Sequence, residues 1–188
     1  MKTAFSEQQT AFYTKNGYLE VELPPVFPQQ VSGYDLWRSD EALKQFLLRK
    51  MGPLVLQLTG RPRLHLAYDR AFAADALPQP ASPIQHLSSI QSLAIGVAMA
   101  KTPAFSEKRL PLGILPCPSK PDHLLFFRPD LILDWPHVHC DLYIALFALP
   151  VAVYIQNPKD PFNPSLKALG YHFGDTLKNE FHPLILRS

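Results

Sequence analysis

Two histidines, a cysteine and an aspartate directly precede the longest apolar run of the chain, in DWPHVHCDLYIALFALPVAVYIQN (134–157). If PHVHC is extended, His137 and His139 point to the same side, because alternate residues of a strand share a face. Two imidazoles on one face can hold zinc, iron or nickel, with Cys140 pointing away. Pro136 directly before them equally favours a loop in which neither histidine binds a metal.

Three neighbouring candidates have a structural interpretation beside a chemical one. His86 is either a metal ligand or a hydrogen-bonded histidine at the start of a strand. Asp141, placed before an apolar strand, is typical of a turn or cap as well as of a catalytic base. A nucleophilic Cys140 needs a nearby base, but adjacent residues of a strand alternate direction. The sequence therefore assigns no catalytic residue.

Length and charge restrict the class of protein. At 188 residues the chain is long enough for one domain with a proper core. Its net charge is +2, and its basic residues are scattered rather than gathered in the stripe of a nucleic-acid binder. We therefore expect a small-molecule ligand or a protein as partner, and no nucleic acid.

The apolar segments predict neither export nor membrane insertion. The N-terminus lacks the uninterrupted apolar core of a signal peptide. The longest apolar run, 142–155, contains Pro150 and is shorter than the roughly 20 residues of a membrane span. Cys117 and Cys140 make no disulfide framework. We expect a cytoplasmic protein with no membrane partner.

The elements that must position these residues begin with a short helix and a strand. Ser6 and Gln9 have the spacing of a capping box, and Asn16-Gly17 predicts the end of the helix. YLEVE (18–22) alternates apolar and acidic residues, which predicts a half-buried strand.

A second helix is predicted after Ser39. Apolar residues recur there at helical spacing, and Asp40 and Glu41 favour its positive end. Gly52-Pro53 predicts its stop, followed by a turn or two of helix before Gly60.

From residue 63 onward, short strands replace helices. The chain has 20 prolines, about twice the usual share of ~5%, and they favour short strands and fixed turns. In the first strand, Leu64, Leu66 and Tyr68 are predicted to share one face. Helices followed by strands indicate an antiparallel sandwich or barrel with helices outside. The predicted strands are 63–72, 91–100, 110–118 (strand or turn), 123–128, 131–135, 142–149 and 151–156.

The last segments carry weaker signals. NPKDPFNP (157–164) is typical of a turn cluster, and NPSLKALG (163–170) predicts one or two helical turns. The tail FHPLILRS (181–188) either returns as an edge strand or docks without pairing.

In this order the chain resembles the phytanoyl-CoA-hydroxylase-type branch of the iron(II)/2-oxoglutarate dioxygenases, over roughly residues 6–156. The likeness lies in the sequential order of six segments rather than in one motif. They are FYTKNGYLEV (12–21), LVLQLTGRPRLHLAYDRAF (54–72), IQHLSSIQSLAIGVAMA (84–100), GILPCPSKPDH (113–123), LLFFRPDLILDWPHVH (124–139) and the closing run 142–155.

The resemblance implies a double-stranded β-helix, a cupin-like jelly roll with flanking N-terminal helices. In this single domain, 1–62 supplies helices and a first strand that pack on the roll. Residues 63–156 form the β-helix core, and 157–188 form a C-terminal tail.

The resemblance also implies a metal set. In active members two histidines and a carboxylate hold iron, and a basic residue of the closing strand pairs with 2-oxoglutarate. His86 matches the first ligand, and His137 or His139 matches the distal one. Ser88, a neutral and weak ligand, stands at the carboxylate position. The closing strand contains no basic residue, so the implied cofactors are iron(II) and 2-oxoglutarate, or none.

A competing placement takes His139 and Asp141 as the His-x-Asp pair, with His182 as third ligand and Arg187 as anion partner. It would put nearly all strands before the first ligand and leave almost no chain for a closing strand. We therefore favour the placement on His86, Ser88, His137 and His139.

Three functions are predicted, two from the resemblance and one from the His/Cys cluster. The first is a catalytically degenerate, dioxygenase-like module that binds a ligand or a protein, which the missing carboxylate and basic anchor favour. The second is an active iron oxygenase that hydroxylates a small or lipid-like substrate. The third is a metal-responsive regulator that senses iron or zinc through HVHC.

Overall fold

A computed structural model describes residues 4–30, 32–72, 88–100, 114–115, 122–133, 141–160 and 163–187. The helical elements are α1 (Glu7–Asn16), the 3-10 turn η1 (Leu36–Arg38), α2 (Glu41–Gln45), the π-helical η2 (Phe46–Met51), α3 (Gly52–Thr59) and α5 (Asn163–Ala168). The strands are β1 (Tyr18–Glu22), β2 (Gly33–Tyr34), β3 (Arg63–Phe72), β4 (Leu93–Ala100), β5 (Ile114–Leu115), β6 (His123–Phe127), β7 (Ile132–Leu133), β8 (Leu142–Ala148) and β9 (Leu184–Leu186).

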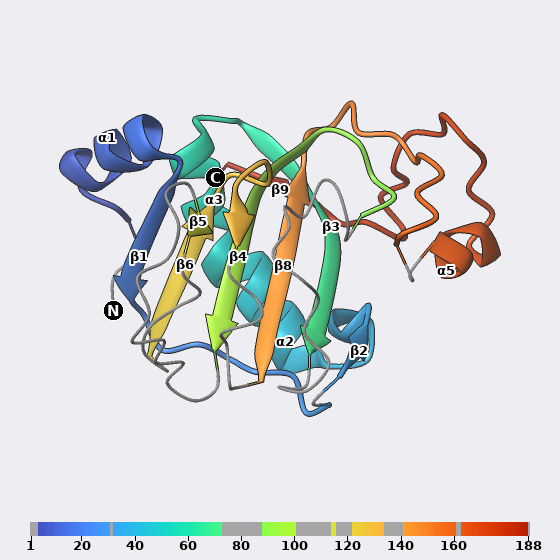
Figure 1. The fold of residues 1–188 in the computed structure, drawn as a ribbon, viewed down its shortest axis with the longest axis horizontal. Helices are drawn as coiled ribbons and strands as arrows, with labels where there is room; N and C mark the ends of the chain where they lie inside the picture. The colour runs from blue at the N-terminus through green and yellow to red at the C-terminus, as the bar shows by residue number, and fades with distance from the viewer. Residues whose placement is uncertain are drawn as a thin grey trace.

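Seven strands form one antiparallel sheet in the order β1-β6-β4-β8-β3-β2, with β9 also paired to β3 (Figure 1). The late strand β8 lies between β4 and β3. β5 and β7 form a separate parallel pair. Strands β1, β2 and β9 lie outside the predicted core of residues 63–156, yet they belong to the same sheet as the core strands.

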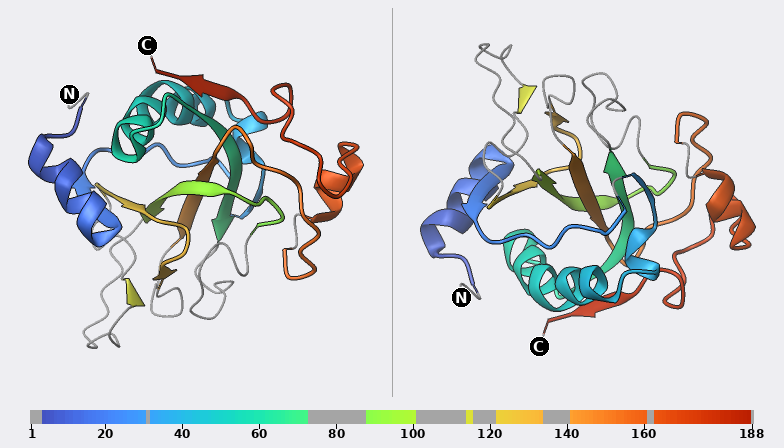
Figure 2. Two further views of the ribbon diagram at one scale, coloured as in Figure 1. Left: turned by 90° about the horizontal axis from the view of Figure 1, so that it is seen from above. Right: turned by 90° about the horizontal axis from the view of Figure 1, so that it is seen from below.

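The two faces of this sheet pack against different partners. The helical segment from α2 to α3 covers one face, and β5 and β7 lie on the other side (Figure 2). We call the second face the roll face. Alternate residues of β8 divide between them, because side chains of a strand point to opposite sides. Tyr143, Ala145 and Phe147 join the helix-side core, and Leu142, Ile144, Leu146 and Ala148 join the roll-face core.

Local signals correctly predicted the first helix. The Ser6 hydroxyl accepts a hydrogen bond from the Gln9 amide, and the Gln9 side chain accepts one from the Ser6 amide. Gly17 ends the helix at φ +79°, a conformation that glycine adopts without steric cost. β1 follows with Leu19 and Val21 buried, as the alternation predicted.

The predicted stop at Gly52-Pro53 is wrong, because the helix continues from Glu41 to Thr59 and ends at Gly60. The Gly52 amide donates to the Leu47 carbonyl five residues back, and this π-type widening accommodates the proline ring. A Cβ at Gly52 would lie 2.7 Å from Ile185 Cγ2 of β9. Close packing, and not helix termination, explains this glycine.

β3 has the predicted bounds but not the predicted faces. A register shift between Leu66 and Tyr68 marks a β-bulge against β8. Leu64 and Leu66 face the helices, whereas Tyr68 faces the roll. An extra residue in one strand reverses the alternation, which explains the misplaced tyrosine.

Other differences are local. The segment 151–156 is not a strand, and only Val153 and Tyr154 form isolated bridges. The sequence did not predict β2 and η1. The tail pairs with β3 through β9, which decides between the two expectations for it.

Candidate functional site

Three of the four predicted metal residues, His86, His137 and His139, lie outside the described residues. The fourth, Ser88, is buried, with 1% of its surface exposed. Its hydroxyl accepts a 2.9 Å hydrogen bond from the Ile90 amide, and its carbonyl accepts one of 3.1 Å from Asn157 Nδ2. Ser88 therefore uses its side chain to stabilise a local turn.

A buried carboxylate lies next to Ser88, although the sequence places serine where the carboxylate was expected. Asp160 Oδ2 accepts a 2.7 Å hydrogen bond from the Ser89 amide, and Asp160 is 2% exposed. Sequence analysis assigned Asp160 to a turn cluster, because nothing in the local pattern indicates a contact 71 residues away.

Asp160 belongs to a polar cluster on the roll face that also contains Tyr68 and Arg70 of β3. Burial raises the pKa of the Tyr68 hydroxyl well above its usual value; the Asp160 charge raises it further and Arg70 lowers it. The Arg70 guanidinium lies 4.6 Å from the centroid of the Tyr34 ring and 4.1 Å from that of Phe72. Both charges thus act on one buried phenol.

The roll face of β8 is apolar. Leu142, Ile144, Leu146 and Ala148 point to this side, and none is more than 1% exposed. Opposite them, Gly96 of β4 is covered so closely by the Phe127 ring that a Cβ would lie 2.3 Å from it. The closing strand therefore offers no cation to a bound dicarboxylate.

The helix side of the sheet holds a second buried carboxylate, Asp69 of β3. Its Oδ2 accepts hydrogen bonds from the Tyr143 hydroxyl at 2.8 Å and from the Trp37 amide at 3.2 Å. Its Oδ1 has no hydrogen-bond partner within the described ranges. Burial raises the pKa of Asp69 to about 7, and the nearby Asp35 adds to this effect, while the Tyr143 hydrogen bond opposes it. Asp69 therefore connects η1 to the sheet through its hydrogen bonds to Trp37 and Tyr143.

Asp35 directly precedes η1 and binds two of its side chains. Its carboxylate accepts hydrogen bonds from Arg38 and, at 3.2 Å, from Trp37 Nε1. Its backbone is left-handed at φ +56°, which is uncommon for a residue with a side chain. The two aspartates together fix the turn that precedes the long helix.

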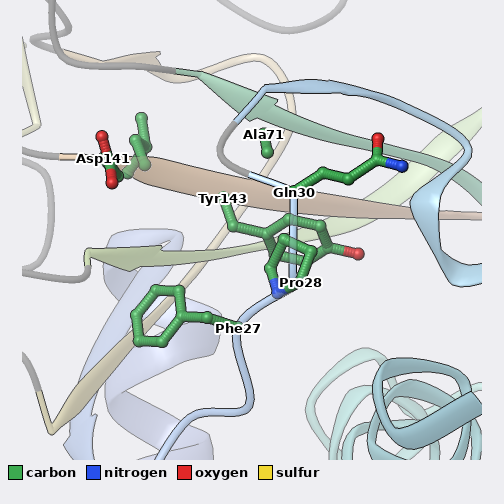
Figure 3. Close-up of a pocket in the computed structure, with 7 residues that line it drawn as sticks. Phe27, Pro28, Gln30, Ala71, Asp141 and Tyr143 are labelled. Carbon is green, nitrogen blue, oxygen red and sulfur yellow. The ribbon is translucent and has the colours of Figure 1, made fainter. Parts of the chain in front are cut away.

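A small recess of about 220 Å³ opens beside Tyr143, lined also by Phe27, Pro28, Gln30 and Asp141 (Figure 3). The carboxylate of Asp141 points away from the Tyr143 hydroxyl in this view. Asp141 therefore does not extend the Asp69–Tyr143 pair into a catalytic arrangement.

The competing ligand set is wrong, because Asp141 and His182 lie at opposite ends of β3. Leu142 pairs with Phe72, whereas the His182 carbonyl accepts a 2.7 Å hydrogen bond from His65 Nδ1. Phe72 lies seven positions after His65 in β3, and at ~3.3 Å per residue this corresponds to roughly 23 Å. One metal ion cannot bind both side chains.

His182 is itself fully buried against the Tyr171 ring, with ring centroids 5.6 Å apart. Neither ring nitrogen has a hydrogen-bond partner among the residues that the structure describes. Burial lowers its pKa to about 3; the charges of Arg38 and His65 act in the same direction, and the nearby backbone of Leu66 and Ala67 opposes them. This histidine is neutral and structural at ordinary pH.

The described residues do not fit an iron centre. No group of three or more histidine, cysteine, aspartate or glutamate side chains comes together within the described part of the chain. Ser88 is committed to its own backbone, and β8 has no basic anchor. No reaction step through iron or 2-oxoglutarate therefore follows from these residues.

Comparison with known proteins adds information on the fold. No protein-family model and no curated protein matches the sequence. Among solved structures, the non-heme α-ketoglutarate-dependent carbocyclase SnoK from nogalamycin biosynthesis has a TM-score of 0.67 at 12% identity, with 96% of each chain covered. The epimerase SnoN from the same biosynthesis has a TM-score of 0.63 at 12% identity, covering 95% of this chain and 97% of that one.

CytC3, solved with Fe(II) and α-ketoglutarate, has a TM-score of 0.60 at 13% identity, covering all of this chain and 90% of that one. This likeness shows the fold alone. The predicted fold, a double-stranded β-helix or cupin-like jelly roll with flanking helices, is confirmed. Within the described ranges, no helix is long and apolar enough to cross a membrane.

Proposed function

We propose that this protein is a catalytically degenerate, dioxygenase-like module that binds a ligand or a protein instead of performing oxidation. The apolar roll face of β8 carries the proposal. A carboxylate of 2-oxoglutarate buried against Ile144 and its aliphatic neighbours would lose its hydration without gaining an ion pair from the closing strand β8. The commitment of the Ser88 hydroxyl to the Ile90 amide supports the same conclusion.

The test is an oxygenase assay together with metal analysis of protein purified without an affinity tag. We expect no oxygen-dependent release of succinate from 2-oxoglutarate and no stoichiometric iron. Calorimetric titration with 2-oxoglutarate in the presence of Fe(II) should give no saturable heat. Stoichiometric iron together with succinate release would overturn the proposal.

A second candidate, an active oxygenase, is favoured by one observation. Asp160 places a carboxylate beside Ser88 and Ser89, and Arg70 lies opposite Ile144 in the pairing of β3 with β8. These two side chains would replace the missing carboxylate and the missing basic anchor from other elements. The histidine ligands would be His86 with His137 or His139.

Matched variants separate these two candidates. Asp160→Asn keeps an acceptor for the Ser89 amide but removes the charge, and Arg70→Gln removes the cation from the roll face. If the second candidate holds, Asp160→Asn lowers iron affinity and Arg70→Gln raises the Kd for 2-oxoglutarate, while Arg63→Gln, exposed at the start of β3, changes neither. If the first holds, none of the three variants changes either measurement.

Within this fold, we propose the phytanoyl-CoA-hydroxylase-type branch as the origin of the chain, because of the sequential order of its six segments. We also propose a cytoplasmic location. Fractionation of cells that express the full chain would test the location.

A further inference from the structure

We propose that a pocket between α1, the end of α3 and the sheet binds a small molecule with an anionic group, a carboxylate or phosphate, on an apolar body. The pocket has an open volume of about 370 Å³ and is lined by residues that include Tyr13, Leu58, Arg61, Leu93, Arg128 and Leu149. It lies where β4 begins and β8 ends, and Tyr13, Leu58 and Leu149 belong to the helix-side core. This proposal therefore does not depend on whether the roll is catalytic.

Two guanidinium groups line the pocket. Arg61 follows the end of α3, is exposed, and forms no side-chain hydrogen bond or ion pair within the described ranges. Arg128 follows β6 and is held in place by a fork to Asp130, with nitrogen–oxygen distances of 3.2 and 3.1 Å. Asp130 offsets one positive charge, so Arg61 gives the pocket its net positive charge. Guanidinium groups bind carboxylate and phosphate oxygens through paired hydrogen bonds.

Tyr13 supplies the second, independent observation. It is only 5% exposed, and its hydroxyl has no hydrogen-bond partner among the described residues. Leaving a buried hydroxyl without a partner costs free energy, and in the proposed complex a bound ligand approaches closely enough to accept a hydrogen bond from it. Burial raises the pKa of Tyr13 well above its usual value, and the hydroxyl therefore remains a donor at neutral pH.

The other lining residues of the pocket favour a ligand with an apolar body. Leu58, Leu93 and Leu149 supply aliphatic contact surface beside the charged groups. The open volume falls within the ~300–1,000 Å³ typical of small-molecule sites. Two carbonyls at the end of α3, those of Gln57 and Leu56, accept hydrogen bonds from the amides of Gly60 and Arg61. They therefore repel an anion less than free helix-end carbonyls would.

Three small probes on the full chain test the proposal, with binding followed by amide chemical shifts. Phenyl phosphate and benzoate represent the two anionic groups, and benzyl alcohol is the neutral control. We expect shifts at Tyr13 and Arg61 with at least one anion, and weaker binding of benzyl alcohol. Comparison of the two anions shows which group the pocket prefers. Failure of both anions to bind, or equal binding of benzyl alcohol, would overturn the proposal.

Variants locate the binding groups. Arg61→Gln should weaken binding of the preferred anion about tenfold or more, whereas Arg63→Gln, an equal charge change outside the pocket wall, should leave it unchanged. Tyr13→Phe removes only the hydroxyl, so it should weaken binding about threefold while keeping or raising Tm. Equal effects of the two arginine variants, or a Tyr13→Phe variant with unchanged affinity, would contradict the assignment.

Discussion

The Tyr143 hydroxyl of β8 donates a 2.8 Å hydrogen bond to the Asp69 carboxylate of β3, in the fully buried layer between sheet and helices. The same oxygen of Asp69 accepts a hydrogen bond from the Trp37 amide. One acid thus connects the neighbouring strands β3 and β8 to η1, which leads into the long helix.

Asp69→Asn is expected to stabilise the protein at alkaline pH. An unfolded aspartate ionises near pH 4, whereas burial raises the folded pKa to about 7. The folded state therefore binds more protons than the unfolded state between these values, and stability falls as pH rises from about 4 to 7. Asparagine imitates the protonated acid, so the variant should gain on the order of 2 kcal/mol over wild type at pH 8.

Urea unfolding at pH 5 and pH 8 measures this difference. The advantage of Asp69→Asn should be small at pH 5 and grow by pH 8. Asp130→Asn, an exposed carboxylate change, is the control. An advantage that does not depend on pH would show that the Asp69 charge is not its source.

His182→Leu should make the protein less sensitive to acid. In the unfolded chain this histidine takes up a proton below about pH 6.5, but in the folded chain burial lowers its pKa to about 3. Stability is consequently lost as pH falls from 6.5 toward 3. The free energy of unfolding of the variant, measured by urea titration at pH 7.5, 6 and 5, should fall less than that of wild type. The exposed His172→Leu should follow the wild-type curve.

Gly96→Ala should destabilise the sheet by roughly 1–3 kcal/mol, because the new Cβ would lie 2.3 Å from the Phe127 ring. In the Phe127→Leu background, Gly96→Ala should cost less stability than it does in wild type, because the smaller side chain leaves room for the methyl group. Thermal unfolding of the four proteins gives the coupling energy. Additive losses would mean that the contact is relieved by backbone movement.

Ser6→Ala should cost about 1 kcal/mol, because the Gln9 amide loses its capping partner. Ser6→Asp keeps an acceptor and should remain close to wild type. Chemical denaturation monitored by circular dichroism measures both. Equal stability of all three proteins would show that α1 gains little from its cap.

The sequence was sufficient where local chemistry decides structure. Ser6, Gln9 and Gly17 predicted the bounds of α1, and the apolar run after Asp141 predicted β8. It failed where a distant segment decides. Ile185 of β9 packs against Gly52, which explains the glycine that was interpreted as a helix stop.

In the candidate site, too, the sequence predicted what local patterns decide and missed what distant segments decide. The sequence predicted a strand over 91–100, and β4 spans Leu93–Ala100, but the bulge that turns Tyr68 toward the roll depends on pairing with β8. Asp160 and Ser89 are 71 positions apart in the sequence, and no local sequence pattern predicts the hydrogen bond between them. His86, His137 and His139 lie outside the described residues, so their roles as ligands remain predictions.

The central position of β8 has a consequence for synthesis on the ribosome. β3 and β4 lie on either side of a strand whose first residue, Leu142, is translated 42 residues after Ala100, the last residue of β4. Until that strand emerges, both neighbours have unpaired backbone edges that can join other chains. A nascent chain arrested before Leu142 should therefore need chaperones, and release of the last quarter of the polypeptide should end that need.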